Sequence, residues 1–523
     1  MCAPYEIIPY TIDDLKEILA KKSGADPKFV EQKIHCLYFE DYFGALNAKV
    51  IVIEEEYIDR DYLEDYAGYY VRCFKEYPRS CSRLHFFTID FGSVELDLIL
   101  QGDKDAIDLQ KDGSYLGFIV VKPLPQTVIG RTCLQTYPSD NGRRHFPSLR
   151  EYKANLFGIS LSIKSLAFQE QDTVVAACAT SALWTAFHGT GKLFQHSIPS
   201  PVEITKMAVE SGFDDPRYIT RTFPNQGLTI NQMAHAIKCV RLEYFHINLR
   251  SVCMLKSVLY AYLRGKIPIL FGAYLFDVSL SNHTCKGKHA ITITGYSLGG
   301  TNPDPKETEQ LKLKALRIDK IYVHDDQVGP FARMKFDGFK VEYSDGNGSL
   351  VAIDSLSTSW PGQNRQMGSI RAVPDMLLIP VYPKIRIPVE AIYVALIDFD
   401  FYIEELRQKQ KIPYNQRIEW DIYLTTVNDL KEDIHKNDLF RGKAKWDFLT
   451  TDLPHFLWRA TAMSGEMYVF DLLFDATDII QGDFLIYVIK YDHLASAILK
   501  ATCEDADMTD FPFDLQRILK RFL

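Results

Sequence analysis

Three residues in the middle of the chain have side chains that together could catalyse acyl transfer. Cys178 stands where a run of helical spacing begins, His289 stands at the mouth of a predicted strand, and Asp325 ends the next predicted strand. A thiol, an imidazole and a carboxylate can act as nucleophile, base and orienting partner of the base. The order and element positions of the three residues therefore predict a nucleophilic site.

The residues after Cys178 predict an amphipathic helix that starts at the thiol. Apolar side chains recur at i, i+3, i+4, i+7 and i+8, namely at Ala179, Ala182, Leu183, Ala186 and Phe187. This is the spacing of a helix with one buried face. Unpaired N–H groups and the positive end of the helix dipole would stabilise a thiolate there. The alternative interpretation is a buried structural cysteine, because free cysteines are among the most buried residues.

A glutamine upstream of the thiol could complete an oxyanion hole. Gln171 lies seven residues before Cys178, and its side-chain amide could lie beside the Cys178 N–H. Together these two donors would stabilise the negative charge that develops on a carbonyl oxygen under attack.

Strand parity predicts which side chains face the thiol. His289 shares a strand face with Ile291 and Ile293, so its ring is half desolvated, which suits a base near pH 7. Asp325 shares parity with apolar residues of the strand over 318–326, so Asp325 should face His289 and Asp326 should turn outward. The alternatives are a core histidine satisfied by the backbone and a pair of acids that caps a turn.

The combination resembles the papain-like cysteine peptidases, most closely the bacterial type typified by double-glycine leader peptidases and their intracellular relatives. In that group a glutamine precedes the cysteine, a turn and a strand precede a Gly-x-His-Ala strand that runs into Gly-Tyr, and an aspartate ends the next strand. The matching residues, all within 157–340, are Gln171, Cys178, Gly265-Lys266-Ile267-Pro268, Gly287-Lys288-His289-Ala290-Ile291, Gly295-Tyr296 and Asp325.

The chain departs from this family pattern at three positions. Gln171 is seven residues before the cysteine where six is usual, so Gln169 or Gln171 could be the oxyanion donor. Ala179 stands where the family often has glycine, and Asp326 instead of proline follows Asp325. The resemblance implies a Cys178, His289 and Asp325 triad, a covalent acyl-enzyme, and no metal or organic cofactor.

Composition places this site in a multidomain globular protein. The chain has 523 residues, 47% hydrophobic residues and a net charge of −9, which indicates packed domains and argues against nonspecific nucleic-acid binding. Ten scattered cysteines without paired spacing, no signal peptide and no apolar run long enough to span a bilayer predict a cytoplasmic protein.

The expected fold class is α+β, with a central papain-like domain between two α+β domains. We expect an N-terminal domain over 1–155, the catalytic domain over 156–345, a linker or long loop over 346–374, and a C-terminal domain over 375–523. The middle segment is rich in Ser, Gly, Pro and Gln without clear periodicity, which favours a loop.

The expected function is an intracellular cysteine hydrolase, either a peptidase or an isopeptidase, acting on a peptide or protein. The flanking domains would select substrate, bind a regulatory protein or hold the enzyme inactive. Two alternatives stay open: an acyltransferase or transglutaminase, and a papain-like binding module without turnover. The spacing of His283, Cys285 and His289 could also ligate zinc, but two lysines in the same loop argue against a cation.

Overall fold

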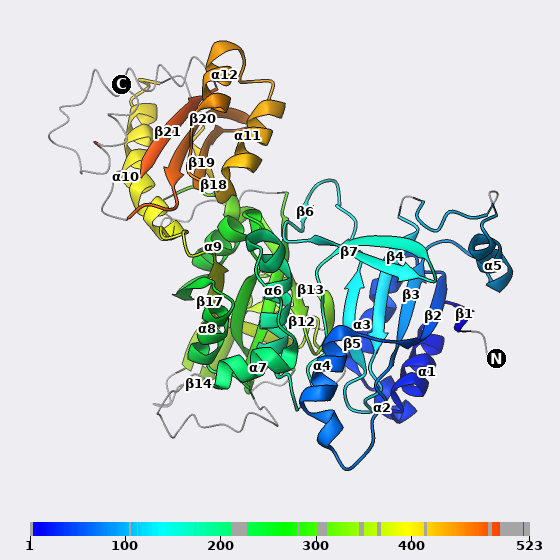
Figure 1. Cartoon of the computed structure of the whole chain (residues 1–523). Helices are drawn as coiled ribbons and strands as arrows, with labels where there is room; N and C mark the ends of the chain where they lie inside the picture. The colour runs from blue at the N-terminus through cyan, green and yellow to red at the C-terminus, as the bar shows by residue number, and fades with distance from the viewer. Residues whose placement is uncertain are drawn as a thin grey trace. The chain divides into compact units, whose positions relative to one another are not determined.

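The computed structural model describes residues 4–516, apart from 104–105, 112, 173, 211–226, 280–282, 301–310, 345–349, 363–367, 413–415, 480–483 and 492–515. Helices account for 33% and strands for 35% of it, which confirms the mixed α+β class. The chain divides into two compact units (Figure 1). The first comprises 1–249, 266–297 and 319–380, and the second comprises 250–265, 298–318 and 381–523.

An antiparallel five-stranded sheet begins the first unit. Its order follows the chain: β1 (Tyr5–Pro9), β2 (Val50–Tyr57), β3 (Cys81–Phe87), β4 (Tyr115–Val121) and β5 (Ile129–Leu134). All residues of β3 and β4 are buried, so these strands have side chains packed on both faces of the sheet. The connecting helices are α1 (Ile12–Ser23), α2 (Pro27–Glu31), α3 (Ile34–Leu46), α4 (Arg60–Gly68), the 3-10 turn η1 (Tyr70–Arg72) and α5 (Ser93–Gln101).

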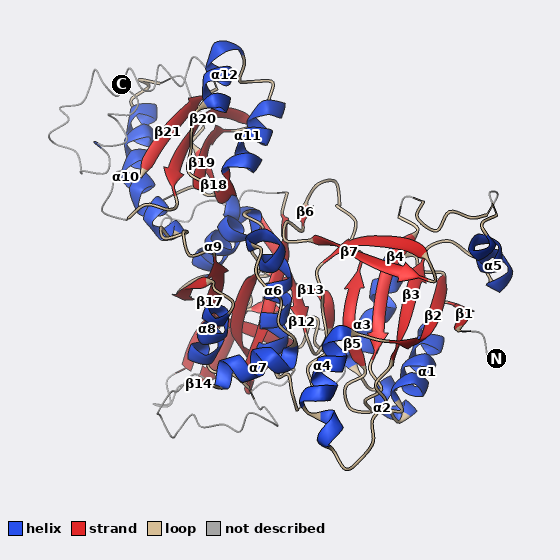
Figure 2. Cartoon of the chain, viewed as in Figure 1, coloured by secondary structure: helices blue, strands red, loops and turns tan. Residues whose placement is uncertain are grey.

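A second sheet of the same unit closes on itself, and Figure 2 draws its strands β12, β13 and β17 in red. The strands pair in the order β10, β11, β12, β13, β16, β17, and β17 pairs again with β10. Strand β9 pairs with β17 as a further neighbour outside the closed order, and β6 pairs with the end of β11. The bounds are β6 (Arg144–His145), β9 (Glu243–Asn248), β10 (Ile269–Asp277), β11 (Thr284–Leu298), β12 (Ile318–Asp325), β13 (Gly329–Lys335), β16 (Leu356–Ser357) and β17 (Ile370–Val381).

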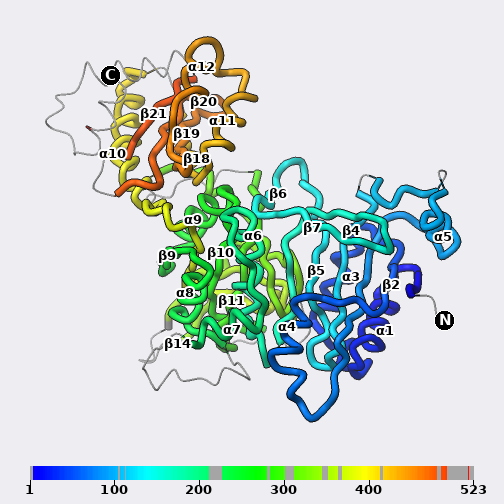
Figure 3. Tube along the Cα trace, viewed as in Figure 1, coloured from blue at the N-terminus to red at the C-terminus, as the bar shows by residue number. Residues whose placement is uncertain are grey.

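Helix α6 is buried on nearly all sides. Of its seventeen residues thirteen are buried, whereas the sequence predicted only one buried face. Small residues permit this, because a Cβ at Gly189 would lie 2.7 Å from Pro268. Helices α7 and α8 pack against α6 (Figure 3), whereas the hairpin of β7 and β8 lies against β4 and β5 of the five-stranded sheet. The bounds are α6 (Cys178–Phe194), α7 (Pro201–Val209), α8 (Ile230–Cys239), β7 (Arg150–Leu156) and β8 (Ile159–Ser165).

Helix α3 lies between the two sheets of the first unit. On one side Phe43 stacks on Phe86 of β3, with ring centroids 4.3 Å apart. On the other side the Tyr38 hydroxyl donates a hydrogen bond to the Pro330 carbonyl of β13. The expected boundary near residue 155 is therefore not a boundary between compact units, because both sheets pack through α3 into one body.

The segment expected to be a linker over 346–374 instead contributes strands, which corrects the predicted domain plan. Strand β15 (Leu350–Asp354) forms a hairpin with β14 (Lys340–Ser344), and β16 and β17 complete the closed sheet. The irregular pattern has a physical cause, since the pairing of β17 with β10 changes register around Pro374. The residues Asp345-Gly346-Asn347-Gly348, whose composition predicts a turn, lie outside the described residues.

The second unit contains an antiparallel four-stranded sheet with strands in chain order. It draws on 250–265 and 298–318 as well as the C-terminal region, so its composition differs from the predicted domain over 375–523. Its Asp421 carboxylate accepts hydrogen bonds from Tyr260 and Lys314, which joins these separate segments. The elements are α9 (Val252–Arg264), η3 (Lys314–Arg317), α10 (Val389–Gln408), β18 (Glu419–Thr426), α11 (Val427–Lys436), α12 (Gly442–Thr450), β19 (Phe456–Ser464), β20 (Met467–Asp475) and β21 (Leu485–Lys490).

Within the described ranges, every helix is too short or too polar to cross a bilayer.

Candidate active site

Cys178 is the first residue of α6, as the sequence predicts. Ala177 caps the helix without a side-chain hydrogen bond, and N–H groups in a first helical turn have no acceptor within the helix. The thiol is partly exposed. It therefore stands at the positive end of a buried helix while remaining accessible to a substrate.

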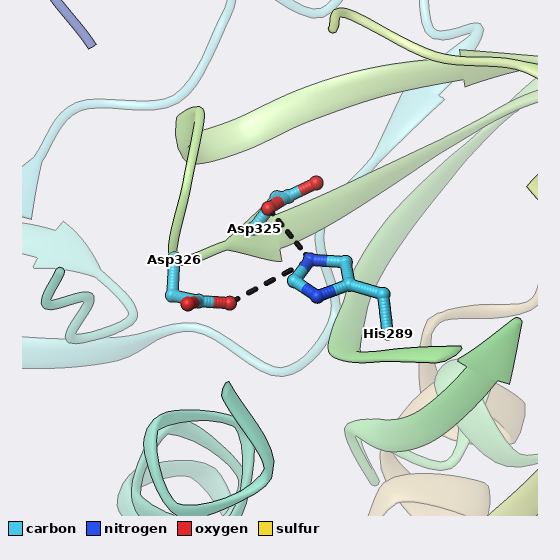
Figure 4. Close-up of side chains that lie close together, drawn as sticks. All are labelled: His289, Asp325 and Asp326. Atoms are coloured by element: carbon cyan, nitrogen blue, oxygen red, sulfur yellow. Dashed lines mark hydrogen bonds and ion pairs between the residues drawn. The ribbon is translucent and has the colours of Figure 1, made fainter. Parts of the chain in front are cut away.

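His289 connects the thiol to a buried carboxylate. The imidazole is 8% exposed, and its Nε2–H donates to Asp325 Oδ1 at 2.9 Å. The Cys178 thiol raises the pKa of this ring, and Cys178 and His289 line one cavity. Figure 4 shows the second ring nitrogen turned away from the carboxylates, which leaves Nδ1 for the thiol.

The surroundings of His289 favour the charged imidazolium. Burial by itself would lower the pKa of His289, but the negative charge of Asp325, the hydrogen bond to Asp325 and the nearby Cys178 thiol raise it well above the ordinary value. An imidazolium beside a cysteine at a helix start is an environment in which cysteines react as nucleophiles.

Asp325 is held as an ionised carboxylate by three donors. Besides His289, the Gln327 N–H donates to Oδ1 at 3.1 Å and the Trp360 indole N–H donates to Oδ2 at 2.6 Å. Burial opposes ionisation, but His289 and these donors outweigh it and lower the pKa of Asp325. The predicted contact of Asp325 with His289 is present in the structure.

The prediction that Asp326 turns outward is wrong. Asp326 is buried, and its Oδ1 lies 3.6 Å from the same Nε2 of His289 (Figure 4). The pairing of β12 with β13 changes register between Val323 and Asp325, so strict alternation ends before the two aspartates. Burial raises the pKa of Asp326 to about 7, with His289 opposing and Asp325 adding to the rise.

Trp360 is a site residue that the sequence did not reveal. Its ring meets His289 edge to face, with centroids 5.4 Å apart and planes at 79°, while its indole N–H binds Asp325. Covering this ion pair with an aromatic ring strengthens it by excluding water. A lone tryptophan inside the expected linker was the only sequence signal for this role.

The two candidate oxyanion glutamines lie in the loop that leads into Cys178. This loop folds back on itself, because Asp172 and Ala176 form an antiparallel bridge with N–H to O distances of 2.8 and 3.1 Å. The bridge brings the backbone of Gln171 toward the residues just before the thiol. Gln169, in contrast, has a buried side-chain N–H group that finds no acceptor among the described residues.

A cavity of 390 Å³ adjoins Cys178 and His289. Most of its remaining lining residues are apolar or glycine; the exceptions are Thr229, Gln232 and an ion pair at 3.2 Å between Lys288 and Asp375. Such a cavity fits an apolar group of a bound molecule. The other lining residues are Ala179, Gly227, Leu228, Ile230, Met233, Gly272, Ala273, Ala290 and Met376.

Two sets of residues carry side chains that could ligate a metal. His283, Cys285 and His289 lie along or next to strand β11, where six residues span about 20 Å, so these three side chains do not converge. His289, Asp325 and Asp326 do converge, with ligand atoms within 4.8 Å of one another. However, each Asp325 oxygen already accepts a protein N–H, an arrangement that suits a carboxylate orienting an imidazole.

Comparisons of the chain with protein-family models, with curated proteins and with solved structures find no match.

Proposed function

We propose that the protein is a papain-like cysteine hydrolase that cleaves a peptide or isopeptide bond. The observation that carries this proposal is the placement of Cys178 and His289 on one cavity, with His289 hydrogen-bonded to the buried Asp325. A thiol at a buried helix start, a base and an ionised carboxylate are the groups needed to form and resolve an acyl-enzyme.

Each group has a defined step in this mechanism. The sulfur of Cys178 attacks the substrate carbonyl carbon while His289 holds the thiol proton. His289 then gives that proton to the leaving amine, and the acyl group remains on sulfur as a thioester. Water attacks the thioester, passes its proton to His289, and the thiol is restored as the acid product leaves.

Asp325 supports these steps by holding the ring through Nε2, so that Nδ1 serves the thiol and the leaving group. The adjoining apolar cavity would bind an apolar side chain next to the bond that is cleaved. The substrate class that follows is a polypeptide with such a residue beside the scissile bond.

The state of the cysteines supports action in a reducing compartment such as the cytoplasm. The eight cysteines within the described ranges are all free, as expected where thiols are kept reduced.

Selective alkylation tests the proposal. At pH 6.5 iodoacetamide should modify Cys178 at least about tenfold faster than any other cysteine, because a cysteine at a helix start beside an imidazole that can take its proton reacts as a nucleophile. Cys239 and Cys285 are more exposed than Cys178 and serve as internal controls. Burial raises the pKa of Cys36 to about 11 and that of Cys133 to about 12, so neither should compete.

Peptide mapping by mass spectrometry measures these rates. Labelling that follows exposure, with Cys239 and Cys285 ahead of Cys178, would contradict an activated nucleophile and favour a binding module. Transfer of the acyl group to an added amine in preference to water would assign the acyltransferase reaction instead.

Single substitutions distinguish the two oxyanion candidates. The variant that lacks the donor should lose about 100- to 1000-fold in kcat, while the other should stay within a few-fold of wild type. We expect Gln171→Ala to be the impaired variant, because the bridge between Asp172 and Ala176 brings its backbone toward the thiol. A larger loss in Gln169→Ala would move the role to the buried amide of Gln169.

A further inference from the structure

The first turn of α3, from the N-terminal part of the chain, contacts both segments that carry the candidate site. Lys33, the N-cap residue of this helix, forms an ion pair with Glu170. His35, two residues later, places Nε2 3.0 Å from the Asp326 carbonyl oxygen. Glu170 lies in the loop before Cys178, and Asp326 lies in the turn after Asp325.

Glu170 is held by contacts on both of its carboxylate oxygens. Oε1 pairs with Lys33, and Oε2 accepts the N–H groups of Val128 and Ile129, each at 3.0 Å. The side chains of Lys33 and Glu170 are 9% and 7% exposed, so neither charge is compensated by bulk water. Because Gln169 and Gln171 flank Glu170 directly, this anchor limits the positions that both amides can adopt.

His35 holds the turn on the other side of the site. The ring is buried, and burial lowers the pKa of His35, so a neutral imidazole donates its Nε2–H to the Asp326 carbonyl at neutral pH. One turn later in the helix, Tyr38 donates to the Pro330 carbonyl. Its ring lies so close to Gly329 that an added Cβ there would be 2.4 Å from Tyr38 Cδ1.

We propose that Lys33 and His35 are positioning residues of the active site, Lys33 for the oxyanion loop and His35 for the turn that bears Asp325 and Asp326. The inference rests on the proposed hydrolase function. It makes the N-terminal part of the chain a component of the catalytic centre, in place of the substrate-selecting or inhibitory domain that the sequence suggested. Donors in an oxyanion hole must be placed to within about 0.5 Å, which explains why a buried ion pair anchors this loop.

The test for Lys33 compares two reactions of the full-length protein. Amide hydrolysis needs the oxyanion donors, whereas alkylation of Cys178 by iodoacetamide needs only the thiol and the imidazole. Lys33→Met should therefore lower kcat about 10- to 100-fold with little change in KM and an alkylation rate within about threefold of wild type. Lys33→Arg keeps the charge and should recover most of kcat.

Lys28→Met is the matched control, because Lys28 is an exposed lysine on the adjacent helix α2, and it should match wild type. His35→Leu should slow hydrolysis and alkylation together and shift their pH profiles, since it frees the turn that orients His289. His35→Gln retains an N–H donor and should restore the wild-type profile.

Two results would overturn the inference. One is an unchanged kcat in Lys33→Met, and the other is a parallel fall of kcat and alkylation in that variant, as a smaller folded fraction would produce. A wild-type protein whose Cys178 resists alkylation would instead overturn the proposed function itself, whatever the Lys33 variants do. The two failures are therefore distinguishable.

Discussion

Cys178→Ala is expected to abolish hydrolysis of peptide substrates, with kcat at least about 10,000-fold below wild type. The substitution removes the sulfur on which the acyl group forms, and neither His289 nor Asp325 can replace it. Cys178→Ser should be nearly as inactive, because a hydroxyl gives up its proton far less readily than a thiol. Suitable substrates are peptides with an apolar residue beside the scissile bond, with product formation followed by mass spectrometry.

The fold should survive the Cys178→Ala substitution. Cys178 is partly exposed at the first position of α6, and alanine is the best helix former, so the free energy of unfolding should change by about 1 kcal/mol or less. Cys285→Ala, at an exposed cysteine, is the control for loss of a thiol and should be fully active. Full activity of Cys178→Ala would rule out the mechanism, and inactivity through unfolding alone would support a structural cysteine.

Asp325→Ala should have the second largest effect, a loss of roughly 100- to 1000-fold in kcat/KM. It removes the acceptor for His289 Nε2 and leaves the Gln327 and Trp360 N–H groups unpaired, which should also destabilise the fold by about 1–3 kcal/mol per donor. We expect a smaller loss than for Cys178, because Asp326 remains 3.6 Å from Nε2 and the pair of Cys178 and His289 persists.

Asp326→Asn is the matched comparison. We expect a loss of about tenfold, since the variant removes a second negative charge near the imidazolium while keeping the side-chain volume. The pKa of Asp326 near 7 means that this charge is present mainly above pH 7, so the difference from wild type should grow between pH 6 and pH 8. Measurements of kcat/KM for both variants across this pH range, with unfolding measured in parallel, decide which aspartate orients His289. A more severe defect in Asp326→Asn than in Asp325→Ala would transfer the orienting role to Asp326.

Local patterns in the sequence were sufficient to predict the elements that carry the candidate site. The helix start at Cys178 and the strand that ends at Asp325 appear where the sequence predicts them. The strand that buries His289 is also present, but it begins at Thr284 instead of at His289. Periodicity succeeds here because each element buries a repeating set of side chains, and that set depends only on helix or strand geometry.

The prediction from strand parity that Asp326 turns outward was wrong, because the register change at the end of β12 depends on the partner strand. The residues Asp325, Asp326 and Gln327 carry no sequence signal for the change of register between β12 and β13. The inward position of Asp326 could therefore not be predicted. The same limit hid the last strands of the closed sheet, where Pro374 interrupts the pairing of β17 with β10.

The sequence by itself therefore determined which residues could do chemistry and which elements present them. Tertiary structure alone decided which distant side chains complete the site. Trp360 reaches Asp325 only because the sheet closes through β16 and β17. Lys33 and His35 reach the same region only because α3 packs between two sheets. These contacts join residues more than thirty positions apart, and they exist because burying apolar surface brings the segments together, a non-directional force that leaves no local pattern in the sequence.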